Sequence, residues 1–218
     1  MELSISPIIR FFMVEGVPFE TIILLLMLPI IATFIAFLRQ VVGIKAFGIY
    51  TPLIITFAFL ATNGLRYGVA IFLAVLLIGM LMRFILKPFR LLYLPRVAIM
   101  LTVVALLVLV FLAFGGQMHR TGLAAVSIFP ILIMITLVEK FVAVQIEKGN
   151  KTALILALET LIISIVGFYI ASWSSLIRLV VGFPWLILLT IPINILIGKW
   201  TGLRISEYIR FKDVIKKL

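Results

Sequence analysis

The sequence predicts an all-α integral membrane protein, a bundle of seven transmembrane helices with its N terminus outside and its C terminus in the cytoplasm. Three observations predict this: the apolar composition, seven long apolar runs, and basic residues gathered on alternate connections. Hydrophobic residues make up 65% of the 218 residues and charged residues 12%, whereas a soluble domain carries about 25% charged residues. Lipid is the solvent that fits, and roughly 20 residues per crossing leave room for about seven or eight helices.

The apolar runs follow one another with short breaks. They cover residues 19–38, 47–62, 67–86, 97–114, 123–138, 152–173 and 184–200. Turn dipeptides that contain glycine separate several runs, and the fifth helix is expected to continue as a polar stalk to residue 147. The apolar link 174–183 forms either an interfacial helix or the first part of a longer seventh helix kinked at Pro184.

Basic residues give the orientation. Of the 19 Lys and Arg residues, 15 follow odd-numbered helices, and only Arg10, Arg66, Arg120 and Arg178 fall on the other side. Basic residues in short connections mark the cytoplasmic side. The sequence therefore predicts an extracytoplasmic segment 1–17, a seven-helix domain 18–203 and a basic cytoplasmic tail 204–218. This topology accounts for most of the +11 charge without nucleic acid, and it predicts affinity of the inner face for anionic lipid head groups.

Residue types exclude most catalytic chemistry. The chain has no cysteine and one histidine, His119, which excludes thiolate catalysis and a multi-histidine metal centre. It also lacks a zinc-protease motif, a phosphate loop and a glycine-rich dinucleotide turn. We therefore expect a protein that is not an enzyme and that binds neither a metal nor a cofactor.

Glu159 is the acidic residue that falls deepest inside a predicted span, about two turns or roughly 12 Å into the sixth helix. An ionised side chain in the middle of a membrane helix costs about 2.5–3.5 kcal/mol, so it is a functional candidate. One hypothesis makes it a proton or cation site, or a ligand contact, together with Asn194 and Thr51. The other makes it structural, paired to a basic side chain or hydrogen-bonded as a neutral acid. Polar residues in the spans can likewise serve only to bond helix to helix.

A second set of charged residues lies at the predicted cytoplasmic edge, on several different connections and helix ends. The set is Lys45, Arg96, Glu139, Lys140, Arg204 and Glu207. These residues could lock the inner ends of the helices or form a docking surface for a cytoplasmic partner. They could also be ordinary interfacial charges.

Four stretches carry a resemblance to a known family. They are residues 39–52 (RQVVGIKAFGIYTP), 92–96 (LYLPR), 127–130 (SIFP) with 136–141 (TLVEKF), and 198–211 (GKWTGLRISEYIRF). Together they resemble the bacterial seven-transmembrane module that is usually fused to an inactive transglutaminase-like domain. The resemblance runs from about residue 18 to residue 211. Fewer than 20 residues precede it, too few for that domain, so it concerns the membrane part.

The resemblance implies a multi-pass protein of the bacterial inner membrane. It also implies two partners, an extracytoplasmic transglutaminase-like domain and a cytoplasmic ATP-grasp ligase, in a system that handles a peptide or amino-acid conjugate. We therefore expect a non-enzymatic receptor or scaffold that relays an extracytoplasmic ligand or partner-domain state to a cytoplasmic partner. The alternative is a proton-coupled transporter of a small peptide or amino-acid conjugate that uses Glu159.

Overall fold

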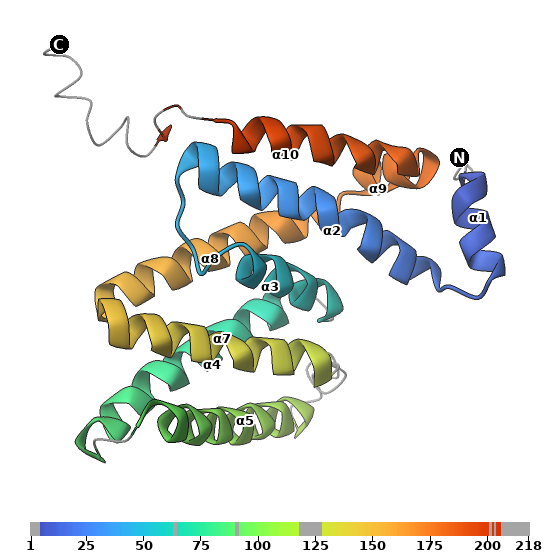
Figure 1. The fold of residues 1–218 in the computed structure, drawn as a ribbon. Helices are drawn as coiled ribbons and strands as arrows, with labels where there is room; N and C mark the ends of the chain where they lie inside the picture. Colours follow the sequence, from blue (N-terminus) through green and yellow to red (C-terminus); the bar gives the residue numbers. More distant parts are fainter. Residues whose placement is uncertain are drawn as a thin grey trace, which may run out of the picture. The chain divides into compact units, whose positions relative to one another are not determined.

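A computed structural model of the chain describes residues 5–62, 65–89, 92–117, 128–200, 202 and 204–205. Every regular element in these ranges is a helix (Figure 1). The chain divides into two compact units. The first unit is Met1–Lys45 with Tyr169–Leu218, and the second unit is Ala46–Phe168.

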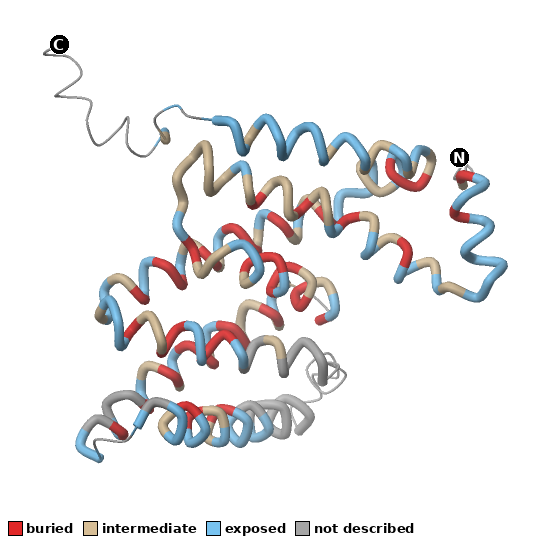
Figure 2. The backbone as a smooth tube through the Cα atoms, viewed as in Figure 1, coloured by how far each residue is buried: buried red, intermediate tan, exposed pale blue. Residues whose placement is uncertain are grey.

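The second unit contains most of the buried core. Its elements are α3 (Tyr50–Ala61), α4 (Leu65–Leu86), η2 (Lys87–Phe89), α5 (Tyr93–Gln117), α7 (Ile128–Lys148) and most of α8 (Asn150–Ala171). Helix α7 packs against α3, α4 and α5, and Figure 2 shows buried residues where α3, α4 and α7 face one another. The fully buried rings of Phe59, Phe72 and Phe141 lie in this core, and Phe59 meets Phe72 edge to face at 6.4 Å.

Two glycines allow helices of this unit to approach closely. A Cβ on Gly167 of α8 would lie 2.6 Å from Oγ1 of Thr56 on α3. A Cβ on Gly68 of α4 would lie 2.5 Å from the ring of Phe59. Small residues at contacts are the usual means by which membrane helices pack, because lipid gives no hydrophobic drive to bring helices together.

The first unit combines helices from the two ends of the chain. Its elements are α1 (Pro7–Val14), α2 (Phe19–Phe37), η1 (Leu38–Val42), α9 (Ser174–Gly182), η3 (Pro184–Leu189) and α10 (Thr190–Gly198). Helix α10 packs along α2. The short helices α1 and α9 meet through buried Ile9 and Val181, and the Ser6 N–H donates to the Val181 carbonyl at 3.3 Å.

Within the described residues, the expected helices agree with those observed apart from shifts of a few residues at most of their ends, and α7 continues to Lys148 as the expected stalk. Residues 123–127 of the fifth expected run lie outside the described residues, and the helix α1 was not expected. The link 174–183 is the helix α9, and a bend of 103° separates it from the helical stretch Pro184–Gly198. So sharp a bend fits a separate helix, the first of the two expectations, better than one long kinked helix. Its place at the membrane interface stays a prediction.

Within the described residues, three helices are long and apolar enough to cross a membrane: Phe19–Val42, Leu65–Met82 and Asn150–Ala171. The bent pair that ends in α10 would make a fourth if it forms one span. The part of the chain that the structure describes is therefore all-helical, with three or four candidate spans by length and composition. The count of seven spans and the N-out orientation stay predictions.

Candidate functional site

An irregular loop at the start of the second unit is the centre of the candidate site. Residues 46–49 precede α3, and two of them have left-handed backbone angles, with φ of +40° at Ala46 and +85° at Gly48. Glycine adopts this region freely, whereas an alanine there costs about 1–2 kcal/mol. Ala46 is also buried. The loop therefore needs contacts from outside itself to hold this conformation.

Two adjacent side chains of α8 supply these contacts. The Ala46 N–H donates to Oε2 of Glu159 at 2.9 Å, and the Phe47 N–H donates to Oγ1 of Thr160 at 3.0 Å. Thr160 is fully buried and Glu159 is half-buried. A hydrogen bond to a carboxylate is roughly twice as strong as one between neutral groups. We call the two backbone N–H groups of Ala46 and Phe47, together with the side chains of Glu159 and Thr160, the loop clamp.

Further polar contacts continue the clamp along α3 and α8. One turn beyond Thr160, the Ser164 hydroxyl lies 3.1 Å from the Pro52 carbonyl, and the Thr56 hydroxyl lies 3.3 Å from the Ser164 carbonyl. The Ser164 and Thr56 side chains are fully buried. Each interhelical hydrogen bond of this kind contributes about 0.6 kcal/mol in a membrane. Each hydroxyl also lies 2.8 Å from a carbonyl of its own helix, that of Thr160 for Ser164 and that of Pro52 for Thr56. The single proton of each hydroxyl is therefore shared between its own helix and the neighbouring one.

The loop also contacts α7. The rings of Phe47 and Phe141 meet edge to face with centroids 6.5 Å apart. A few residues on, Thr51 lines a groove between α3 and α7, together with Glu139 and Lys140. The loop and the first turn of α3 thus lie between Glu159 on α8 and the charged pair on α7.

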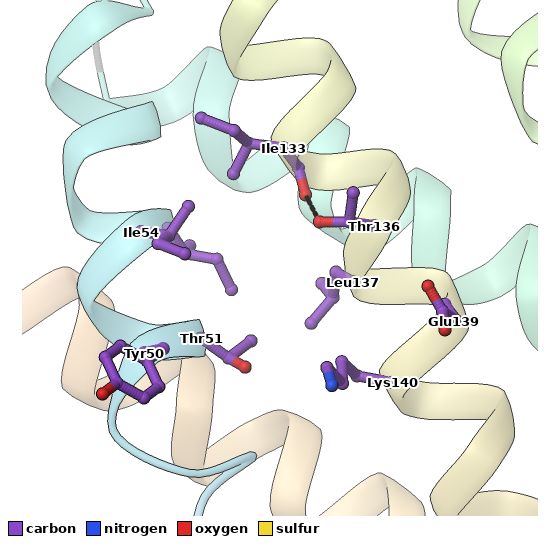
Figure 3. A pocket seen from close by; sticks show the side chains of 9 residues that line it. Tyr50, Thr51, Ile54, Ile133, Thr136, Leu137, Glu139 and Lys140 are labelled. Atoms are coloured by element: carbon purple, nitrogen blue, oxygen red, sulfur yellow. Dashed lines mark hydrogen bonds between the residues drawn. The ribbon is translucent and has the colours of Figure 1, made fainter.

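The ligand-site candidates fall in both units. In the second unit, Glu159 binds the loop before α3, and Thr51 belongs to the first turn of α3 and lines the groove (Figure 3). Asn194 belongs to the first unit, where its side-chain amide donates to Oγ1 of Thr33 and to the carbonyl of Thr190, both at 2.7 Å. The bond to Thr33 joins α10 to α2, whereas the bond to Thr190 lies within α10, so Asn194 has a helix-bonding role through Thr33.

The charged residues expected at the cytoplasmic edge are divided between the two units. Glu139 and Lys140 are exposed and line the groove, and Arg96 is half-buried near the start of α5. In the first unit, Lys45 is exposed and Arg204 is half-buried. Glu207 lies outside the described residues. A single ring formed by all six residues stays a prediction.

Sequence reasoning missed the groups that Glu159 binds, because they are backbone N–H groups of Ala46 and Phe47. The available signal was the spacing of Gly43 and Gly48, both of which have positive φ. Two glycines five residues apart after a long apolar run indicate an irregular backbone, and a nearby acid can satisfy its donors.

Comparison with known proteins identifies the family. The model of a family described as seven transmembrane helices usually fused to an inactive transglutaminase matches residues 8–215. Searches of curated proteins and of solved structures found no match. The match covers nearly the whole chain and agrees with the resemblance seen in its motifs. The chain belongs to this family of seven-transmembrane modules.

Proposed function

We propose that the chain is a non-enzymatic receptor or scaffold of the bacterial inner membrane. It relays the state of an extracytoplasmic ligand or partner domain to a cytoplasmic partner, and a transglutaminase-like domain and an ATP-grasp ligase are the proposed partners. The family description, with its inactive transglutaminase, is consistent with a role outside catalysis. The loop clamp is the single observation that carries the proposal.

The clamp gives Glu159 a structural task. Its Oε2 atom accepts the Ala46 N–H at 2.9 Å, a bond that satisfies a buried backbone donor which would otherwise be costly in a membrane. An acid that couples transport to protons must be free to exchange its proton during the cycle. Because the carboxylate holds the backbone, the clamp supports the scaffold hypothesis over the proton-site hypothesis.

The clamp also suggests how a signal could pass between helices. A bond to a charged group contributes about 1.5–3 kcal/mol, and the left-handed Ala46 costs about 1–2 kcal/mol. The difference between the two terms lies between about −0.5 and +2 kcal/mol, which overlaps the lower part of the range of ordinary allosteric coupling, about 1–3 kcal/mol. Release would shift the first turn of α3 relative to Glu139 and Lys140 on α7.

Association with the cytoplasmic ligase tests the relay. An ATP-grasp ligase from the same bacterium, the proposed partner, should co-purify with the wild-type protein from detergent-solubilised membranes, and less with Arg96→Ala or Glu139→Ala. Lys148→Ala is the matched control, because Lys148 is an exposed residue on the same helix as Glu139 and outside the groove. Absence of association with the wild type would refute cytoplasmic docking.

A transporter is the second candidate, and the broken helices favour it. Helix α3 has only 12 residues and follows an irregular loop. Helix α9 and the next helical stretch are bent by 103° relative to each other. Interrupted helices often surround transport sites. Uptake of a labelled peptide or amino-acid conjugate into proteoliposomes under a proton gradient tests it. Uptake that Glu159→Gln leaves unchanged would remove the proposed coupling site.

A further inference from the structure

Helices α1 and α9 share a small core with the start of α2 in the first unit. The buried residues of this core are Ile9 of α1, Val181 of α9 and Ile22 of α2, and the Ser6 N–H donates to the Val181 carbonyl at 3.3 Å. Figure 1 shows α1 crossing the direction of α2 rather than extending it. The core therefore holds α1 across the start of α2 and leaves the other faces of α1 open.

The open faces of α1 differ in chemistry. Ile8, Phe11 and Phe12 follow the i, i+3, i+4 spacing of one helix face, and all three are exposed, Phe11 by 60%. Arg10 is the one charged residue of α1, and it is exposed as well. At 3.6 residues per turn, Arg10 lies about 160° around the helix from both Ile8 and Phe12. Helix α1 therefore has an exposed apolar face and an exposed charged side.

Aromatic side chains flank α9 at both ends. Trp173 precedes the helix, Phe183 and Trp185 follow it, and all three are exposed. The rings of Phe183 and Trp185 meet edge to face with centroids 6.2 Å apart. Arg178 of α9 is exposed and donates to the Ser175 hydroxyl at 3.1 Å. Exposed tryptophans are typical of the head-group level of a membrane, because the ring is apolar and its N–H needs a polar partner.

Both helices adjoin the ends of candidate membrane spans. Helix α1 ends at Val14, and the span Phe19–Val42 begins after a short link. Helix α9 begins at Ser174, directly after the span Asn150–Ala171 ends. The distribution of basic residues predicts that both of these span ends face outward. Helices α1 and α9 are therefore within reach of the head groups of the extracytoplasmic leaflet.

We propose that α1 and α9 form an anchor that binds the lipid surface of the extracytoplasmic leaflet. The Ile8 face of α1 lies below the head groups, as in an interfacial helix, whose apolar face enters the acyl boundary by about 5–10 Å. The exposed charges around it, Arg10, Arg178, Glu15 and Glu20, are of both signs, as are the phosphate and ammonium groups of phospholipids. The anchor places residues 7–14 in the membrane interface, whereas the sequence predicts only an extracytoplasmic segment.

Spin labels in this cysteine-free chain measure the depth of α1 in liposomes of phosphatidylethanolamine and phosphatidylglycerol. The labelled variants are Ile8→Cys and Phe12→Cys, with Arg10→Cys on the same helix as the matched control. Collision rates with oxygen and with a water-soluble nickel complex give the depth of each label. Labels at 8 and 12 should lie roughly 5–10 Å below the head groups, and the label at 10 should be open to the nickel complex. Leu28→Cys, exposed on α2, gives the deep reference, about 14 Å along the helix from Phe19.

The native tryptophans test α9 without any substitution in the anchor. The chain has three tryptophans, so in Trp200→Phe the emission comes from Trp173 and Trp185. Lipids brominated near the head group should quench this emission more strongly than lipids brominated near the chain ends. Emission that neither lipid quenches would overturn the anchoring of α9.

Three results with the spin labels would overturn the anchoring of α1. Labels at 8 and 12 that are as open to the nickel complex as the label at 10 would show that α1 stands in water. Labels closed to both reagents would show that protein covers this face, either a second copy or a partner domain. Labels as deep as the one at 28 would show that α1 lies inside the bilayer. Neither substitution opens a cavity in the core, because Ile8 and Phe12 are exposed.

Discussion

Substitutions of Glu159 should lower the free energy of unfolding. The loss should be larger when the acceptor for the Ala46 N–H is removed than when a neutral acceptor replaces it. Glu159→Ala removes a bond to a charged group, which contributes about 1.5–3 kcal/mol, and leaves a buried donor unsatisfied. Glu159→Gln keeps a neutral acceptor, so it should cost only about 1 kcal/mol. The predicted order of stability is wild type, then Gln, then Ala.

Ala46 provides a test of the same contact from the other side. Its φ of +40° costs about 1–2 kcal/mol for alanine and little for glycine, so Ala46→Gly should stabilise the wild type. In the Glu159→Ala background the loop is free to relax, and the same substitution should gain less. A double-mutant cycle measures this difference as a coupling free energy.

Reversible unfolding in mixed micelles of mild detergent and sodium dodecyl sulfate, followed by circular dichroism, gives these free energies. Leu158→Ala is the control, because Leu158 neighbours Glu159 in sequence but is 59% exposed. Either of two results would rule out the loop clamp: Glu159→Ala as stable as the control, or Ala46→Gly that destabilises the wild type as a glycine in an ordinary helix would.

Three further predictions concern packing and topology. Gly167→Ala should destabilise the α3–α8 contact by about 1–3 kcal/mol, because its Cβ would lie 2.6 Å from Thr56 Oγ1, and adding Thr56→Ala should restore part of the loss in the same unfolding assay. Asn194→Ala should cost only about 0.6 kcal/mol, so a loss above roughly 2 kcal/mol would indicate another role. In this cysteine-free chain, Glu15→Cys should react with an impermeant maleimide added outside spheroplasts, and Lys151→Cys should react only after lysis. The reverse pattern would show that the N terminus lies in the cytoplasm.

The sequence was sufficient for the membrane class and for the approximate helix positions, because both follow from apolar runs and their punctuation. The helix α9 was recognised only as one of two options. Hydropathy records that residues 174–183 are apolar, whereas the 103° bend before η3 and α10 depends on how the chain turns at Phe183 and Pro184. Periodicity alone does not encode that turn.

The candidate site was predicted in part. Glu159 and Thr51 were selected because polar groups are rare within membrane helices. Glu159 binds the loop that precedes α3, and Thr51 belongs to the first turn of α3. Asn194 was selected for the same reason, but its bonds are to Thr33 and Thr190 in the first unit. The loop clamp could not be found from side-chain types, because the partners of Glu159 and Thr160 are backbone donors in a loop of unusual φ.

Amide hydrogen exchange at Ala46, measured by NMR on the protein in detergent micelles, tests the loop clamp most directly. We expect the Ala46 amide to be protected in the wild type although it lies outside any helix. In Glu159→Ala it should exchange at least roughly tenfold faster, the factor that corresponds to about 1.4 kcal/mol. If the wild-type Ala46 amide exchanges as fast as that of an exposed turn, or at the same rate with and without the Glu159 side chain, the loop clamp does not exist.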